Sequence, residues 1–123
     1  MTEKEIFVTA MKNRTKKLAV DVINFCDTLK NKKASSVITY QLVKSATSTG
    51  ANYRAACRAR SQNEFYSKMC IVVEEVDETE YWLEIIKECE LSPEKAELKR
   101  LLNETSELIK ITSKAKNSTY SKK

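Results

Sequence analysis

Apolar side chains recur along this chain at steps of three and four residues, which is the period of an amphipathic helix. Four stretches carry the pattern, over residues 7–29, 37–56, 65–86 and 98–109. The third is the most regular, because its apolar positions alternate between steps of four and three as in a coiled-coil heptad. The positions predicted to face a core are Phe7, Met11, Leu18, Val22, Phe25, Leu29, Val37, Ile38, Leu42, Ala46, Thr49, Tyr53, Ala56, Phe65, Met69, Val72, Val76, Thr79, Leu83, Ile86, Leu98, Leu101, Leu102, Thr105, Leu108 and Ile109.

Residues that can cap a helix precede each stretch. Thr2 and Ser61 are each followed three positions later by a glutamate, the spacing of a capping box that satisfies free backbone amides at a helix start. The serine pair at 35–36 can cap the second helix, and Ser92 followed by Pro93 can start the fourth. The sequence therefore predicts four helices that begin at these residues, the first of them ending near residue 30.

Turn-forming residues are almost absent. The chain has one glycine and one proline among 123 residues, which argues against a fold of many strands and hairpins and fits a single domain. We expect an all-α fold, an antiparallel up-and-down four-helix bundle, over residues 1–113. Residues 114–123 are polar and rich in lysine, and are expected to form a basic flexible tail.

Seven consecutive small residues, from Ser45 to Ala51, interrupt the second stretch. Gly50 costs a helix about 1 kcal/mol relative to alanine, so it is predicted to mark a close approach of another helix. Arg54, Arg58 and Arg60 follow and would lie at a fixed place beside that contact. This part of the chain is therefore the first place to look for function.

Catalytic and metal-binding patterns are lacking. The chain has no histidine, and its four cysteines form no C-x-x-C pair and no zinc spacing, so buried free thiols are expected. Ser92 and Lys95 match S-x-x-K, but a helix cap explains that serine more simply. We predict that the protein is not an enzyme and has no catalytic residue, metal or cofactor. Without a long apolar run or a secretory signal, a cytoplasmic protein with no membrane contact is expected.

Charge is divided along the chain, although the net charge is only +5. Residues 1–73 carry 13 basic and five acidic side chains, residues 74–107 carry four and 12, and residues 108–123 carry five and none. Arg14 stands in a gap of the first apolar stripe, where it either extends past the core edge, as we expect, or meets a buried carboxylate.

Three interpretations of this division remain open. The basic part can contact the phosphates of a nucleic acid, favouring RNA or an RNA/DNA hybrid. It can meet the acidic part of another subunit, which makes the protein an interaction scaffold, or both faces can simply be solvated. The candidate phosphate-binding residues are Lys16, Lys17, Lys44, Arg54, Arg58 and Arg60. The candidate oligomer-interface residues are Glu74, Glu78, Tyr81, Trp82 and Glu84.

Several strings in this sequence carry a family resemblance. The most specific are Ser45-x-Thr47-Ser48-x-Gly50-Ala51-Asn52-Tyr53-Arg54 and Glu78-Thr79-x-Tyr81-Trp82-Leu83, with Arg14 to Ala19 before them. The sequence resembles the bacterial four-helix-bundle proteins of 23S ribosomal RNA intervening sequences, also labelled S23 ribosomal protein. It is also similar to the accessory variability protein of diversity-generating retroelements. The resemblance covers residues 14–90.

This resemblance implies an up-and-down four-helix bundle that assembles as a homopentameric ring with a basic surface. For the retroelement relative it also implies binding to nucleic acid and to a reverse transcriptase. These expectations agree with the charge pattern, which points separately to a polyanion or to self-assembly.

Overall fold

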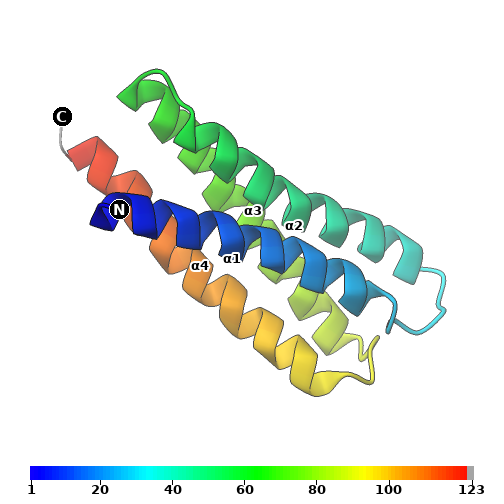
Figure 1. The fold of residues 1–123 in the computed structure, drawn as a ribbon. Coiled ribbons are helices and arrows are strands. Elements are labelled where there is room, and N and C mark those ends of the chain that lie inside the picture. Colours follow the sequence, from blue (N-terminus) through cyan, green and yellow to red (C-terminus); the bar gives the residue numbers. More distant parts are fainter. Residues whose placement is uncertain (122–123) are drawn as a thin grey trace.

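The computed structural model describes residues 1–121, which form four antiparallel helices (Figure 1). They are α1 (Glu3–Cys26), α2 (Ser35–Cys57), α3 (Gln62–Glu88) and α4 (Lys95–Ser121). α2 packs against both α1 and α3, and α3 packs against both α2 and α4. The expected all-α, up-and-down four-helix bundle is therefore confirmed. No helix in the described range is both long and apolar enough to span a membrane.

Each helix buries the face that its apolar pattern predicts. In α3, Met69, Val72, Val76, Leu83 and Ile86 are completely buried, and the corresponding stripes of α1, α2 and α4 meet them in one core. Burial of a side chain of this size contributes about 1.5–3 kcal/mol, so packing rather than helix propensity holds the bundle together.

Two predicted core residues and the predicted tail differ from the structure. Phe7 and Val37 are 45% and 60% exposed. Phe7 lies before the first buried residue of α1, Met11, and Val37 lies on the outward face of α2, directly before the buried Ile38. α4 continues through residues 114–121, which were expected to be a tail, because Thr112 is buried and Ala115 packs against the core. These small side chains extend the buried stripe by another turn. Residues 122–123 of the predicted tail lie outside the described residues.

The helix starts confirm some caps and correct others. Thr2 forms the complete capping box with Glu5. Ser61 accepts a hydrogen bond from the backbone amide of Glu64 at 3.0 Å. Ala34, rather than a serine, precedes α2, and no side chain caps that helix. α1 ends at Cys26, four residues earlier than expected.

The turn between α3 and α4 holds a residue in an uncommon conformation. Glu90 has a φ of 51°, in the left-handed region, and the Leu91 amide donates to the Ile86 carbonyl at 3.0 Å. This is the geometry in which helices commonly end with glycine. The Ser92 hydroxyl is buried, lies 2.7 Å from that of Thr28 and accepts from the Glu94 amide, so α4 begins at residue 95 instead of Pro93.

Hydroxyl side chains form a buried polar layer inside the core. Thr15, Ser45, Thr49 and Thr79 are completely buried, and each donates to a backbone carbonyl one turn earlier in its own helix. The Thr79 and Ser45 hydroxyls also lie 2.9 Å apart, which links α3 to α2. Gly50 lies against this layer, since a Cβ placed on it would be 3.4 Å from Thr15. The predicted close helix approach at Gly50 is therefore confirmed.

Charged side chains bridge the α1/α4 seam, where the two helices approach each other less closely than the other neighbours do. Arg14 binds Glu104 through two hydrogen bonds of 2.6 and 3.1 Å. Arg100 and Lys17 both bind Asp21, at 2.9 and 2.6 Å. Arg14 thus meets a partly buried carboxylate, the less favoured of the two alternatives that the sequence left open.

Candidate nucleic-acid interface

A hollow of about 210 Å³ lies between α1 and α2. Its floor is built from small residues, because Ala19, Thr47, Gly50 and Ala51 bring the two helix backbones close together. Three long basic side chains surround the floor; we refer to this feature as the cationic hollow. Its basic residues are Lys12 and Lys16 of α1 and Arg54 of α2.

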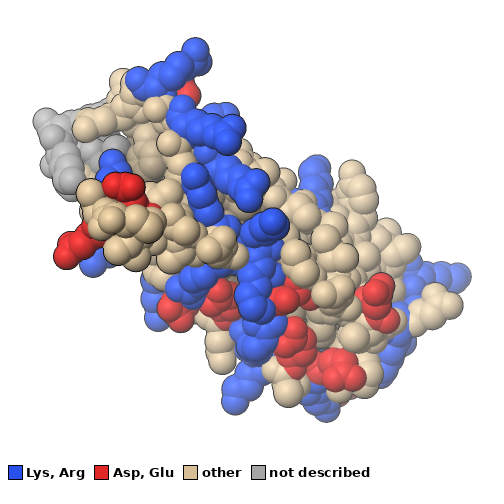
Figure 2. All heavy atoms as spheres, in the orientation of Figure 1, with Lys and Arg blue, Asp and Glu red and all other residues tan. Residues whose placement is uncertain are grey.

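The three cations of the cationic hollow are not neutralised by the protein. Within the described chain, no carboxylate lies within 4.0 Å of Lys12, Lys16 or Arg54, whereas other basic residues form such pairs. Side chains of like charge repel one another, so an anion between them would lower the electrostatic energy. Figure 2 shows the same arrangement at larger scale, with Lys and Arg gathered over α1 and the C-terminal half of α2.

The outward face of α2 carries a regular stripe of exposed residues. They are spaced by alternating steps of three and four, so they stay on one side of the helix. The stripe passes from apolar residues near the start of α2, through small residues beside the cationic hollow, to arginines at the end of the helix. Its members are Val37, Tyr40, Lys44, Thr47, Ala51, Arg54 and Arg58.

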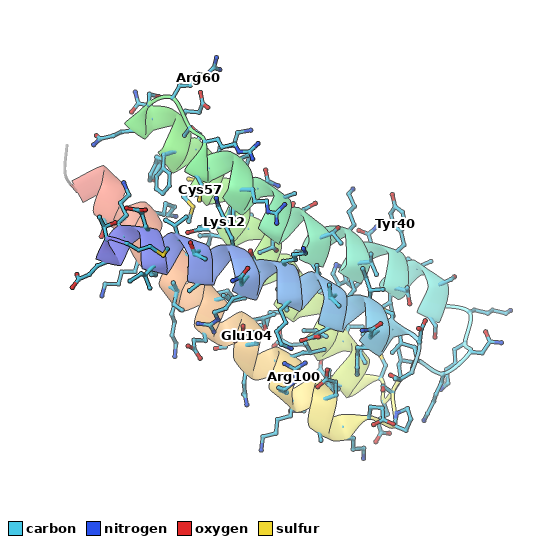
Figure 3. The ribbon with its side chains drawn as sticks, viewed as in Figure 1. Lys12, Tyr40, Cys57, Arg60, Arg100 and Glu104 are labelled. Carbon is cyan, nitrogen blue, oxygen red and sulfur yellow. The ribbon has the colours of Figure 1, made fainter. Side chains whose placement is uncertain are left out.

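The predicted phosphate-binding residues divide into two groups. Lys16 and Arg54 meet at the cationic hollow, and Lys44 and Arg58 lie on the α2 stripe. Lys17 instead turns to the α1/α4 seam and binds Asp21 at 2.6 Å. Arg60, labelled in Figure 3, lies beyond the end of α2 and pairs with Glu64 at 3.5 Å.

Lys12 was not among the candidates predicted from the sequence. Lys12 and Lys16 are four residues apart on α1, so one face of the helix presents both. That spacing is visible in the sequence, but the opposing position of Arg54 depends on the register between α1 and α2. Lys12 is labelled in Figure 3, on the face of α1 that looks toward α2.

The predicted oligomer-interface residues lie on α3. Glu74, Glu78, Tyr81 and Glu84 lie on its outer side, and Tyr81 meets Trp82 edge to face with ring centroids 5.0 Å apart. Trp82 is partly buried against the core, and its indole nitrogen donates to Glu78 at 3.2 Å. Trp82 therefore already has a role within the bundle, while the other four residues remain a surface that another subunit could contact.

Carboxylate pKa values reflect the separation of charges. Burial and the nearby Glu78 raise the pKa of Glu75 on α3, although Lys44 opposes the shift. At the α1/α4 seam, burial would raise the pKa of Asp21, but hydrogen bonds from Lys17 and Arg100 outweigh it and lower that pKa. The negative charge of Glu75 is therefore not fully offset by nearby basic side chains, whereas that of Asp21 at the seam is.

Neither cysteines nor carboxylates are among the residues that line the cationic hollow. The described residues contain no group of three or more His, Cys, Asp or Glu side chains that could hold a metal ion. All four cysteines are free thiols, as expected. The expectation that they are buried is wrong, since Cys89 is exposed and the other three are only partly buried.

Comparisons with known proteins agree with the fold. A family model described as "23S rRNA-intervening sequence protein" matches residues 9–114. The crystal structure of a protein of unknown function from the S23 ribosomal protein family of Bacteroides thetaiotaomicron superposes with a TM-score of 0.78. That protein is 31% identical, and the match covers 89% of this chain and 97% of the other. No curated protein matches this sequence.

Proposed function

This chain belongs to the family of 23S rRNA-intervening sequence proteins, and on that basis we propose that it is a non-enzymatic module that binds nucleic acid through phosphates. The observation that carries the proposal is the cationic hollow, where three basic side chains surround a floor of small residues. Among the described residues, none of the three has a carboxylate partner. A phosphodiester group supplies the missing negative charge, and the low floor lets it approach the helix backbones. A cytoplasmic location accompanies this proposal.

RNA, alone or paired with DNA, is the favoured polyanion. The family description names 23S rRNA, which supports RNA without identifying a target. Contacts made by lysine and arginine to phosphates carry little sequence information, so binding should depend weakly on sequence. They also release counterions, so affinity should fall steeply as salt rises.

The proposal is tested by replacing two arginines of the α2 stripe. Arg54→Ala/Arg58→Ala should weaken binding to every RNA tested and make the salt dependence shallower, by about 0.7–0.9 in the logarithmic slope for each phosphate that is no longer neutralised. Both residues lie on the outside of the bundle, so the far-ultraviolet circular dichroism should not change. Binding is measured by fluorescence anisotropy of labelled RNA between low and high salt.

A matched control is available within the chain. Lys17→Ala/Arg60→Ala removes the same number of positive charges, but both residues are paired with carboxylates. This control variant should lower RNA affinity clearly less, because it keeps the proposed phosphate contacts although its net charge changes by the same amount. Equally weakened binding in the two double variants would mean that only net charge matters. Absence of binding to any RNA or DNA at low salt would refute the proposed function.

Self-assembly is the second candidate, and the exposed acidic surface of α3 favours it. Glu74, Glu78 and Tyr81 lie on one outward side of α3. The outward face of α2 carries the opposite charge, through the basic residues of the α2 stripe. Contacts between two different faces of identical subunits generate a closed ring or an open fibre. The resemblance to pentameric relatives suggests a ring of five subunits, and a reverse transcriptase is a further possible partner.

Light scattering coupled to size exclusion tests this assembly. A ring should have a mass several times the 14.1 kDa of the chain, and the mass should persist at high salt, because exposed ion pairs contribute only about 0–1 kcal/mol each. If Arg58→Glu dissolves the ring and also abolishes RNA binding, the basic face serves protein contact and the scaffold is the better function. A monomer at micromolar concentration excludes the ring.

A further inference from the structure

Tyr40 is the most exposed aromatic side chain among the residues whose burial is described. It is 64% exposed on the outward face of α2. Figure 3 labels it at the edge of the helix, pointing away from α1 into solvent. No hydrogen bond, ion pair or ring contact ties it to any other described residue. The bundle therefore does not use this ring for its own packing.

A second, shallow hollow, formed by side chains of α2 alone, lies beside the Tyr40 ring. Thr39, Val43 and Lys44 line it together with Tyr40, so it combines an aromatic face, an aliphatic wall and one cation. No carboxylate of the described chain lies within ion-pair distance of Lys44. This combination suits a nucleobase and its phosphate, because a base stacks on an aromatic ring while lysine binds the backbone.

The two hollows lie along one stripe of α2. Tyr40 and Arg54 are 14 positions apart, which at 1.5 Å per residue corresponds to about 21 Å along the helix. Thr47 and Ala51 lie between them on the same stripe, and both have small side chains. A strand can therefore pass along this face without obstruction, over a length that suits the shorter single-strand sites of about four nucleotides.

We propose that Tyr40 stacks on an unpaired base of a nucleic acid whose phosphates occupy the cationic hollow, so that the preferred ligand is a single strand. This inference rests on the proposed function and names the class of nucleic acid. In a duplex the bases are stacked on one another and their faces are closed to the protein. Only an unpaired segment can offer a base to Tyr40 while its backbone continues past Lys44 toward Arg54.

The test compares a single-stranded oligouridine of 12 nucleotides with an RNA duplex of the same length. Tyr40→Ala should lower affinity for the single strand by about tenfold, a typical effect of removing one stacking platform, and leave the duplex affinity unchanged. Tyr40→Phe keeps the ring and should bind like the original protein. Phe7→Ala is the matched control, because Phe7 is also an exposed aromatic side chain but lies on α1, away from the α2 stripe.

An oligonucleotide that keeps its phosphates but lacks its bases gives a stricter test. The affinity of the unsubstituted protein for this abasic strand should fall by about the same factor as the Tyr40→Ala substitution causes on oligouridine. The variant should bind the abasic strand no more weakly than oligouridine, because both changes remove the same contact. If the Tyr40→Ala substitution and the loss of the bases reduce affinity independently, so that their effects add, Tyr40 does not stack on a base and the inference is overturned.

The remaining outcomes separate this inference from the proposed function. If Tyr40→Ala binds the single strand normally while Arg54→Ala/Arg58→Ala still weakens binding, the single-strand inference is wrong and phosphate binding stands. If no oligonucleotide binds, the proposed function itself fails. If Tyr40→Ala instead reduces the mass measured by light scattering, Tyr40 is a subunit contact and the inference is overturned.

Discussion

Exchanging Gly50 and its neighbour Ala51 tests how closely α1 and α2 must approach. Both residues lie in the middle of α2, but Gly50 faces α1 and Ala51 is exposed. A methyl group on Gly50 would lie 3.4 Å from the backbone carbon, the carbonyl oxygen and the hydroxyl oxygen of Thr15. That distance is an ordinary van der Waals contact, so the substitution should not force the helices apart.

The expected magnitudes follow from this geometry. Gly50→Ala removes the conformational penalty of glycine in a helix and should raise the free energy of unfolding by about 0.5–1 kcal/mol. Ala51→Gly introduces the same penalty at an exposed position and should lower it by about 1 kcal/mol. The double exchange should be close to neutral, because the gain at position 50 and the loss at position 51 offset each other.

Urea denaturation followed by circular dichroism measures these differences in the free energy of unfolding. The protein concentration is kept the same for all variants, because the stability of an assembled protein depends on its concentration. If Gly50→Ala lowers the free energy of unfolding by more than about 1 kcal/mol, the contact with Thr15 requires a bare backbone and the reasoning from the 3.4 Å distance is wrong. Ala51→Gly is the control for the possibility that any substitution in the middle of α2 destabilises the protein. Its loss of stability should equal the helix-propensity difference between alanine and glycine.

Two further substitutions test local features of the bundle. Glu90→Gly should raise the free energy of unfolding by about 1 kcal/mol, because the backbone of Glu90 is in the left-handed region, which glycine adopts without strain. A lower melting temperature of the variant would contradict this. Glu75→Gln should stabilise the protein at pH 7: the pKa of Glu75 is raised in the folded state, so its ionised form opposes folding. The gain should vanish as the pH falls below about 4.3, because the carboxyl is then protonated in both the folded and the unfolded state. Glu88→Gln, at an exposed position farther along α3, is the control. A gain that persists in acid would refute the sign of the effect.

Helix type and phase could be predicted from the sequence because the apolar period extends over many turns. α3 shows this best, since each predicted position from Met69 to Ile86 is buried. The ends of the core were harder to predict. Phe7 continues the pattern before the first buried residue of α1, and Val37 lies on the outward face of α2 beside the buried Ile38. Thr112 extends the buried stripe of α4 beyond Ile109, the last position that the sequence assigned to the core.

The candidate site could be predicted only in part, because it depends on contacts between helices. The sequence identified Arg54 beside a run of small residues, and three of them, Thr47, Gly50 and Ala51, form part of the floor of the cationic hollow. It did not reveal that Lys12 faces Arg54, since the register of α1 against α2 is a tertiary property. Nor could it show that Asp21 binds Lys17, because an (i, i+4) pair forms only when competing partners allow it.

The α1/α4 seam makes α1 the part of the bundle that can detach at least cost. Regions held by few packed apolar contacts open more readily than the rest, so backbone amides of α1 should exchange with solvent faster than those of α2 and α3. The cationic hollow takes two of its three basic residues from α1 and one from α2. An anion bound there contacts both helices. A nucleic acid that occupies the hollow would therefore hold α1 against α2 and slow the hydrogen exchange of the α1 backbone amides.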